Sequence, residues 1–208
     1  MIEGLFLLIL GCMIAYEIAK AAGFGKACAV LSIAGIMAHE LAHAIGCLVF
    51  HVKVHSVSFL QVEWVGGKFG QLNGSVHHDE VRSAFAAIVI AFAPLVGGLL
   101  WLLLIAWGMS YAQLPGIDPA CGFLLWVLAF SVAATARPSI PDCSNMLSVA
   151  RRYPGQFLMA LLGMLAGGLV WWYFAPTLTE SWSVVATVAA VLVPGWALSK
   201  VYQKGRGQ

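Results

Sequence analysis

Six long apolar stretches constrain this chain more than any other feature of its sequence. Each one approaches the roughly 20 residues that a helix needs to cross a lipid bilayer. They lie near 5–18, 28–50, 84–107, 122–136, 157–175 and 183–202. Charged residues make up only 10% of the 208 positions, too few to cover a water-facing surface. The sequence therefore predicts an all-α polytopic membrane protein with about six transmembrane helices, forming a single membrane-embedded domain over 1–208.

The first apolar stretch is predicted to be a retained span and not a removable signal. It opens with Met1-Ile2-Glu3, which is acidic where a secretory signal is basic. The run Ile9-Leu10-Gly11-Cys12 faintly suggests a lipoprotein cleavage site, but the apolar residues continue to Ala15. We therefore expect flanking helices at 1–20 and 157–202 around a core at 28–150.

A polar stretch at 52–78 interrupts the apolar pattern after the second predicted helix. Apolar and polar residues alternate from Val52 to Phe59, which is typical of a β-strand. Gly66-Gly67 and Asn73-Gly74 are turn signals. This segment is predicted to form a small β-hairpin or sheet.

The distribution of basic residues predicts the orientation. If all six stretches cross, nine Lys and Arg lie on the side of the N-terminus, and only Lys20 and Lys26 lie on the other. Because basic residues concentrate on the cytoplasmic side, both termini are expected there, together with access to the His-rich pattern of the second stretch. The expected surroundings are lipid, and the net charge of +2 is too small to suggest a nucleic-acid partner.

The second stretch carries a metal-binding pattern, His39-Glu40-Leu41-Ala42-His43. Histidines four residues apart lie on one helix face, about one turn apart, so that both imidazoles can bind one Zn²⁺. Zinc lowers the pKa of its bound water toward ~7, and Glu40 is placed to accept the proton as a general base. The structural alternative is a polar cluster that joins helices by hydrogen bonds.

A catalytic zinc site needs a third protein ligand, and Asp142 is the best candidate. It follows the fourth stretch, on the same predicted side as the end of the second. The two prolines of Arg137-Pro138-Ser139-Ile140-Pro141-Asp142 break the helix there. Irregular backbone at membrane depth is tolerated where it lines a cavity enclosed by protein. The alternative is a helix N-cap before 143–150. Asp79 lies in a polar loop, and Asp118 is predicted on the opposite side.

These motifs resemble those of the site-2 protease family of intramembrane zinc metalloproteases. Ala38-His39-Glu40-Leu41-Ala42-His43-Ala44-Ile45-Gly46 is similar to the family's zinc helix, and Pro138-Ser139-Ile140-Pro141-Asp142 to the Pro-Ser-x-x-Asp form of its small prokaryotic members. Cys143 departs from the Gly that many members carry. The resemblance, from about Val30 to Asp142, implies a minimal protease core with one Zn²⁺ on His39, His43 and Asp142. It further implies that Glu40 is the base and that the substrate is a transmembrane protein.

Two other functions compete with the protease. A metal-handling membrane protein, such as a zinc transporter or a metal-stabilised scaffold, would need a path of ligands from face to face, and the sequence offers one cluster. A pseudoenzyme would bind substrates without cutting them, and the intact Glu40 argues against it. His51, His55 and Asn145 are further polar residues, for which we weigh accessory roles near the site against surface positions.

Overall fold

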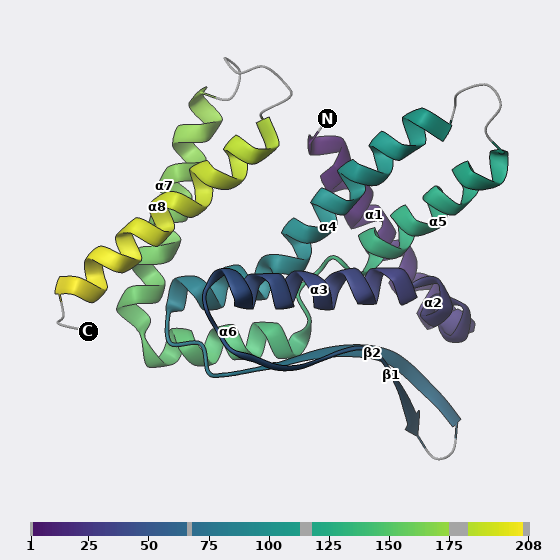
Figure 1. Ribbon diagram of the computed structural model, residues 1–208, viewed down its shortest axis with the longest axis horizontal. Coiled ribbons are helices and arrows are strands. Elements are labelled where there is room, and N and C mark those ends of the chain that lie inside the picture. Colours follow the sequence, from purple (N-terminus) through teal and green to yellow (C-terminus); the bar gives the residue numbers. More distant parts are fainter. Residues whose placement is uncertain (1, 66–67, 113–117, 175–182, 206–208) are drawn as a thin grey trace. The chain divides into compact units, whose positions relative to one another are not determined.

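The computed structural model describes residues 2–65, 68–112, 118–174 and 183–205, and most of them are helical (Figure 1). The helices are α1 (Ile2–Ala19), the π-helix η1 (Lys20–Phe24), α2 (Gly25–Leu31), α3 (Ile33–Val49), α4 (Ala84–Ala112), α5 (Pro119–Thr135), α6 (Ile140–Arg152), α7 (Pro154–Phe174) and α8 (Ser183–Gly205). The strands β1 (Val54–Val65) and β2 (Lys68–His78) form one antiparallel sheet. A mostly helical fold with a hairpin after α3 is confirmed.

Three apolar helical segments are long and apolar enough to cross a membrane, among the residues that the structure describes. They are Leu7–Leu31, Ala84–Ser110 and Pro119–Arg152. Shorter apolar helices cover Ile33–Val49 and Pro154–Val170. The predicted span at 28–50 is divided at Ser32 into α2 and α3.

The chain folds into two compact units. The first holds the chain up to Asp79 together with Phe92–Pro138, and the second holds Glu80–Ala91 and the chain from Ser139 onward. The boundary falls within α4, and the predicted core at 28–150 contains residues of both units.

Three helices pack together in the first unit. Ile9 of α1, Leu102 and Ile105 of α4, and Ala129 and Val132 of α5 belong to one buried apolar cluster. Helices α4 and α5 are antiparallel. A Cβ on Gly98 would lie 2.7 Å from the Cβ of Ala136, at the end of α5, whereas Gly108 faces Leu125, nearer its start.

Helices α1 and α5 run in the same direction. They pack against each other, and Glu17 near the end of α1 forms an ion pair with Arg137, just after the end of α5. Figure 1 shows both helices descending toward this contact.

Helix α3 crosses the middle of α4 and contacts the C-terminal end of α5. Gly35 donates from its backbone N–H to Oγ of Ser131, 2.8 Å away. Two turns further along α3, Ala42 lies against Gly97 of α4. The hydrogen bonds from α3 to α5 reach Ser131 and Thr135, in the last turns of α5.

A tight turn after α3 leads into the hairpin. His51 has φ of 54°, and its N–H donates to the carbonyl of Leu48, while the N–H of Val52 donates to the carbonyl of Cys47. These two bonds define a Schellman motif, which ends a helix with one left-handed residue. Strand β1 then starts at Val54, opposite His78 of β2.

The hairpin differs from its prediction in one detail. Asn73-Gly74 is not a turn, because both residues lie inside β2, where Asn73 pairs with Gln61. The strands connect instead at 66–67, the other predicted turn, which lies outside the described residues. Asn-Gly favours a turn in a sequence because glycine adopts a positive φ without steric cost. In the structure, this glycine serves a close approach to α3, described below.

In the second unit, α7 and α8 form an antiparallel pair (Figure 1). Small residues allow the close approach: a Cβ on Gly163 would lie 2.7 Å from Cα of Gly195. Glycine at helix contacts of this kind is typical of helices that associate in lipid.

Candidate metal centre

The two histidines of the motif meet on the inner side of α3. Nε2 of His39 lies 3.2 Å from Nε2 of His43, and the rings are edge-on, with centroids 4.8 Å apart. His43 is 6% exposed, and Glu40 between them is 7% exposed. The helical spacing therefore brings the two predicted ligand atoms together in a buried place.

The distance between the two Nε2 atoms suits one shared metal ion. Two imidazole nitrogens at about 2.0–2.1 Å from a tetrahedral zinc are separated by roughly 3.3 Å. The observed 3.2 Å agrees with this separation. The same geometry also suits a hydrogen bond, with His43 donating from Nε2 to Nε2 of His39. The donor set accordingly fits zinc without rearrangement of the two rings.

Helix α5 determines which ring nitrogen of His39 faces the predicted metal position. Nδ1 of His39 donates to the carbonyl oxygen of Thr135, 2.8 Å away. Thr135 is the last residue of α5, so its carbonyl has no partner within the helix. This bond places the proton on Nδ1 and leaves Nε2 with its lone pair. Backbone carbonyls commonly orient metal-binding histidines in this way and strengthen their donation to the metal.

The helix break after Thr135 frees that carbonyl. In a continuing helix, the N–H of Ser139 would donate to the carbonyl of Thr135. The break diverts this N–H to Oδ2 of Asp142, 2.7 Å away. The prolines of the 137–142 segment thus have a local consequence that bears directly on His39.

Asp142 belongs to the second unit, where it forms part of a capping box at the start of α6. Its Oδ2 accepts hydrogen bonds from the N–H and from Oγ of Ser139, at 2.7 and 2.6 Å. Ser139 is the N-cap, and Asp142 is the third residue of the helix. The alternative that Asp142 itself is the N-cap is therefore wrong. A carboxylate has about four acceptor sites, so capping does not exhaust its capacity as a ligand. Its role as third ligand stays a prediction.

Glu40 is covered by strand β2. A Cβ added to Gly74 would lie 2.7 Å from Oε1 of Glu40 and 2.8 Å from its Cδ. Distances below 3 Å are shorter than real carbon contacts, so β2 lies directly on the Glu40 side chain at this glycine. The hairpin is therefore part of the immediate surroundings of the predicted base.

A small, mostly apolar pocket borders His39 within the first unit. It lies where α3 meets α4 and α5. Its lining residues are Gly35, Ala38, His39, Pro94, Gly98, Val132, Thr135 and Ala136.

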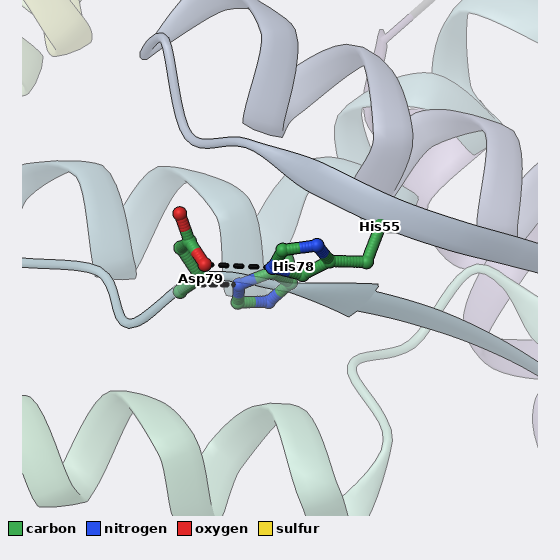
Figure 2. Close-up of polar contacts among 3 residues, drawn as sticks. All are labelled: His55, His78 and Asp79. Atoms are coloured by element: carbon green, nitrogen blue, oxygen red, sulfur yellow. Dashed lines mark hydrogen bonds and ion pairs between the residues drawn. The ribbon is translucent and has the colours of Figure 1, made fainter.

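The other histidines near the hairpin form a separate polar group. Nε2 of His55 lies 2.7 Å from Oδ1 of Asp79, and Nδ1 of His78 lies 2.6 Å from the carbonyl oxygen of Asp79 (Figure 2). His55 and Asp79 are about half exposed. The group closes the open end of the hairpin, where Asp79 also donates from its N–H to the carbonyl of Lys53.

Two further residues have structural positions. His51 is the left-handed residue that ends α3. Asn145 is exposed on α6.

Three residues of this centre were not singled out from the sequence: Gly35, Ser131 and Thr135. Gly35 lies one turn before His39, and Thr135 lies at the end of an apolar stretch. Both positions are weak signals. Gly74 had a signal that pointed to a turn. Thr135 acts through its backbone, which no residue type reveals.

Comparisons with protein-family models, curated proteins and solved structures gave no match to this chain.

Proposed function

We propose that this protein is an intramembrane zinc endopeptidase that cleaves membrane-anchored or transmembrane proteins. One observation carries the proposal. His39 and His43 present their Nε2 atoms 3.2 Å apart, with the His39 ring oriented by Thr135, beside the buried carboxyl group of Glu40. The resemblance of these residues to site-2 protease motifs supports the reaction class.

The surface of the apolar helices supports a membrane location. Leu7, Leu10, Ile14 and Ile18 form a stripe along α1, and each is at least half exposed, up to 70% for Leu7. Trp107 of α4 and Phe123 of α5 are 62% and 68% exposed. A contiguous apolar surface of this kind is unfavourable in water and favourable against lipid. Together with the three long apolar segments, it supports a multi-pass membrane protein.

The zinc site is proposed to consist of His39, His43 and Asp142, with one ion per chain. Zinc, when bound, supplies Lewis-acid activation of water and stabilises negative charge that develops on the peptide carbonyl. The protein residues do the remaining work. Thr135 keeps the proton of His39 on Nδ1, Glu40 accepts a proton from the attacking water, and the same carboxyl group then delivers it to the leaving amine.

The hairpin is proposed to present the substrate. A transmembrane helix hides its peptide bonds in its own hydrogen bonds, so a segment must unwind before it can be cut. An extended segment can add to an open sheet edge through backbone hydrogen bonds. Because β2 lies on Glu40, a strand added to this two-stranded sheet would lie near the base.

The direction of α1 leads us to revise the expected topology. Since α1 and α5 run the same way and α4 runs oppositely, the chain between α1 and α4 starts and ends on the same side. The proposed crossings are α1, α4, α5, α7 and α8, while α3, the hairpin and the polar α6 stay with one side. All 11 Lys and Arg then lie on that side, compared with nine against two before. By the rule for basic residues this side is cytoplasmic, which leaves the N-terminus on the other side and the site accessible from the cytoplasm.

The competing function is metal handling without proteolysis. A transporter needs successive ligand groups along a path, whereas the predicted ligands of this chain form one cluster. Zinc flux in proteoliposomes, lost in His39→Ala, would favour this function over the protease.

The decisive experiment is Glu40→Gln in purified protein. The variant should keep one zinc per chain, because Glu40 is not a proposed ligand, and should lose cleavage of a transmembrane substrate by at least about a hundredfold, the range that general-base catalysis contributes. Zinc is measured by elemental analysis, and cleavage by gel. The matched control is Glu80→Gln, an exposed carboxyl group that pairs with Arg152. Full proteolysis by Glu40→Gln would remove Glu40 as the base.

A further inference from the structure

Strand β2 passes over the Glu40 side chain at Gly74, the one residue type that permits this approach. The carboxyl oxygen Oε1 and the carbon Cδ of Glu40 both lie within 2.8 Å of the position a Cβ would take. Alanine at 74 would therefore have to displace either the strand or the carboxyl group. Glu40 has little room to move away, because it is 7% exposed.

The strand itself is firmly held at this point. Ser75 pairs with Ser58 and Asn73 with Gln61, so Gly74 lies between two paired positions of β2. The register of β1 shifts between Ser58 and Gln61, opposite Gly74, which is a bulge-like irregularity. Irregularities of this type bend a strand and re-aim its residues. The bend and the missing side chain together let β2 rest on α3.

From this geometry we infer that Gly74 is a positioning residue for the base, and that strand β2 holds the Glu40 carboxyl group in its working orientation. The inference rests on the proposed role of Glu40. It assigns to the hairpin a second task beside substrate presentation. A base must lie within hydrogen-bond reach of the proton it removes, so a small displacement of Glu40 reduces turnover while the histidines still bind zinc.

The first test measures the contact without any need for proteolysis. Thermal unfolding in detergent is compared for the wild type, Gly74→Ala, Glu40→Ala and the double variant. Gly74→Ala should lower the Tm by several degrees when Glu40 is present and by much less when position 40 is alanine, because the clash is then gone. An equal loss in both backgrounds would overturn the inference.

The second test measures the role of Gly74 in catalysis. Gly74→Ala should lower kcat at least tenfold, keep KM within about twofold, and retain one zinc per chain. A raised KM with unchanged kcat would assign Gly74 to substrate binding, and loss of zinc would assign it a purely structural role. Either result contradicts the inference.

The matched control is Ser75→Ala, the next residue of the same strand. Its Oγ is buried and has no hydrogen-bond partner among the residues that the structure describes, so its removal should leave the Tm and kcat close to those of the wild type. The two tests also separate this inference from the proposed function. If the Tm values show the coupling but the wild type cleaves no substrate, the contact stands and the protease proposal fails. If the wild type cleaves and the coupling is absent, the opposite holds.

Discussion

At the scale of single residues, Gly35 is the residue that most directly determines where His39 lies. Its N–H donates to Oγ of Ser131, and a Cβ at position 35 would lie 2.6 Å from the carbonyl carbon of Ser131. Helix α3 can therefore touch α5 only with glycine there. This contact lies one turn from the bond between His39 and Thr135.

Gly35→Ala should consequently weaken both folding and zinc binding. Overpacking of this kind costs about 1–3 kcal/mol. Loss of a hydrogen bond that orients a metal ligand typically lowers metal affinity by about 10–100-fold. Zinc titration and thermal unfolding measure the two effects. Gly122→Ala on α5 is the control, because a Cβ at position 122 meets nothing within 4 Å. Unchanged zinc affinity in Gly35→Ala would show that α5 does not orient His39.

At the scale of elements, the end of α3 depends on one strained residue. His51 has φ of 54°, a conformation that glycine adopts freely and that costs other residues of the order of 1 kcal/mol. The turn closes α3 eight residues after His43 and directs the chain into β1. Because α3 ends at this position, the hairpin can fold back over α3.

We expect His51→Gly to raise the free energy of unfolding by up to about 1 kcal/mol, because the left-handed conformation no longer carries a steric cost. His51→Val should lower it by a similar amount or more, since a β-branched residue tolerates positive φ poorly. Zinc content should be the same in both variants. Denaturant titration in detergent provides the measurement, and a destabilised His51→Gly would mean that the imidazole makes a contribution larger than the backbone strain.

At the scale of the whole molecule, the proposed topology and the simple six-span arrangement make opposite predictions for Lys26. In the proposed topology Lys26 and Arg82 share the cytoplasmic side and Asp118 lies on the other. With six crossings, Lys26 would share a side with Asp118 instead. All three side chains are exposed.

Single cysteines at these positions, in a variant without the five native cysteines, distinguish the two arrangements. Right-side-out vesicles are treated with a membrane-impermeant maleimide. Asp118→Cys should react, whereas Lys26→Cys and Arg82→Cys should react only after the vesicles are opened. Labelling of Lys26→Cys together with Asp118→Cys in intact vesicles would contradict the proposed topology.

Much of the architecture is local and could be read from the sequence. The spacing of His39 and His43 places both on one helix face in any α-helix, and the alternation after Val52 predicts strands regardless of what surrounds them. Apolar length likewise predicted the long helices. Apart from the second stretch, which is divided into α2 and α3, the predicted bounds differ from the observed ones by a few residues. These features follow from the periods of helices and strands, which a sequence carries directly.

Only the tertiary structure decided the contacts that complete the first unit's centre. The carbonyl of Thr135 meets His39 across 96 residues, and Arg137 meets Glu17 across 120. No periodicity encodes such pairs, because they depend on how helices pack and on which direction each one runs. Gly74 shows the same difference: the sequence indicates that the backbone there needs freedom, and only packing shows that the reason is the carboxyl group of Glu40.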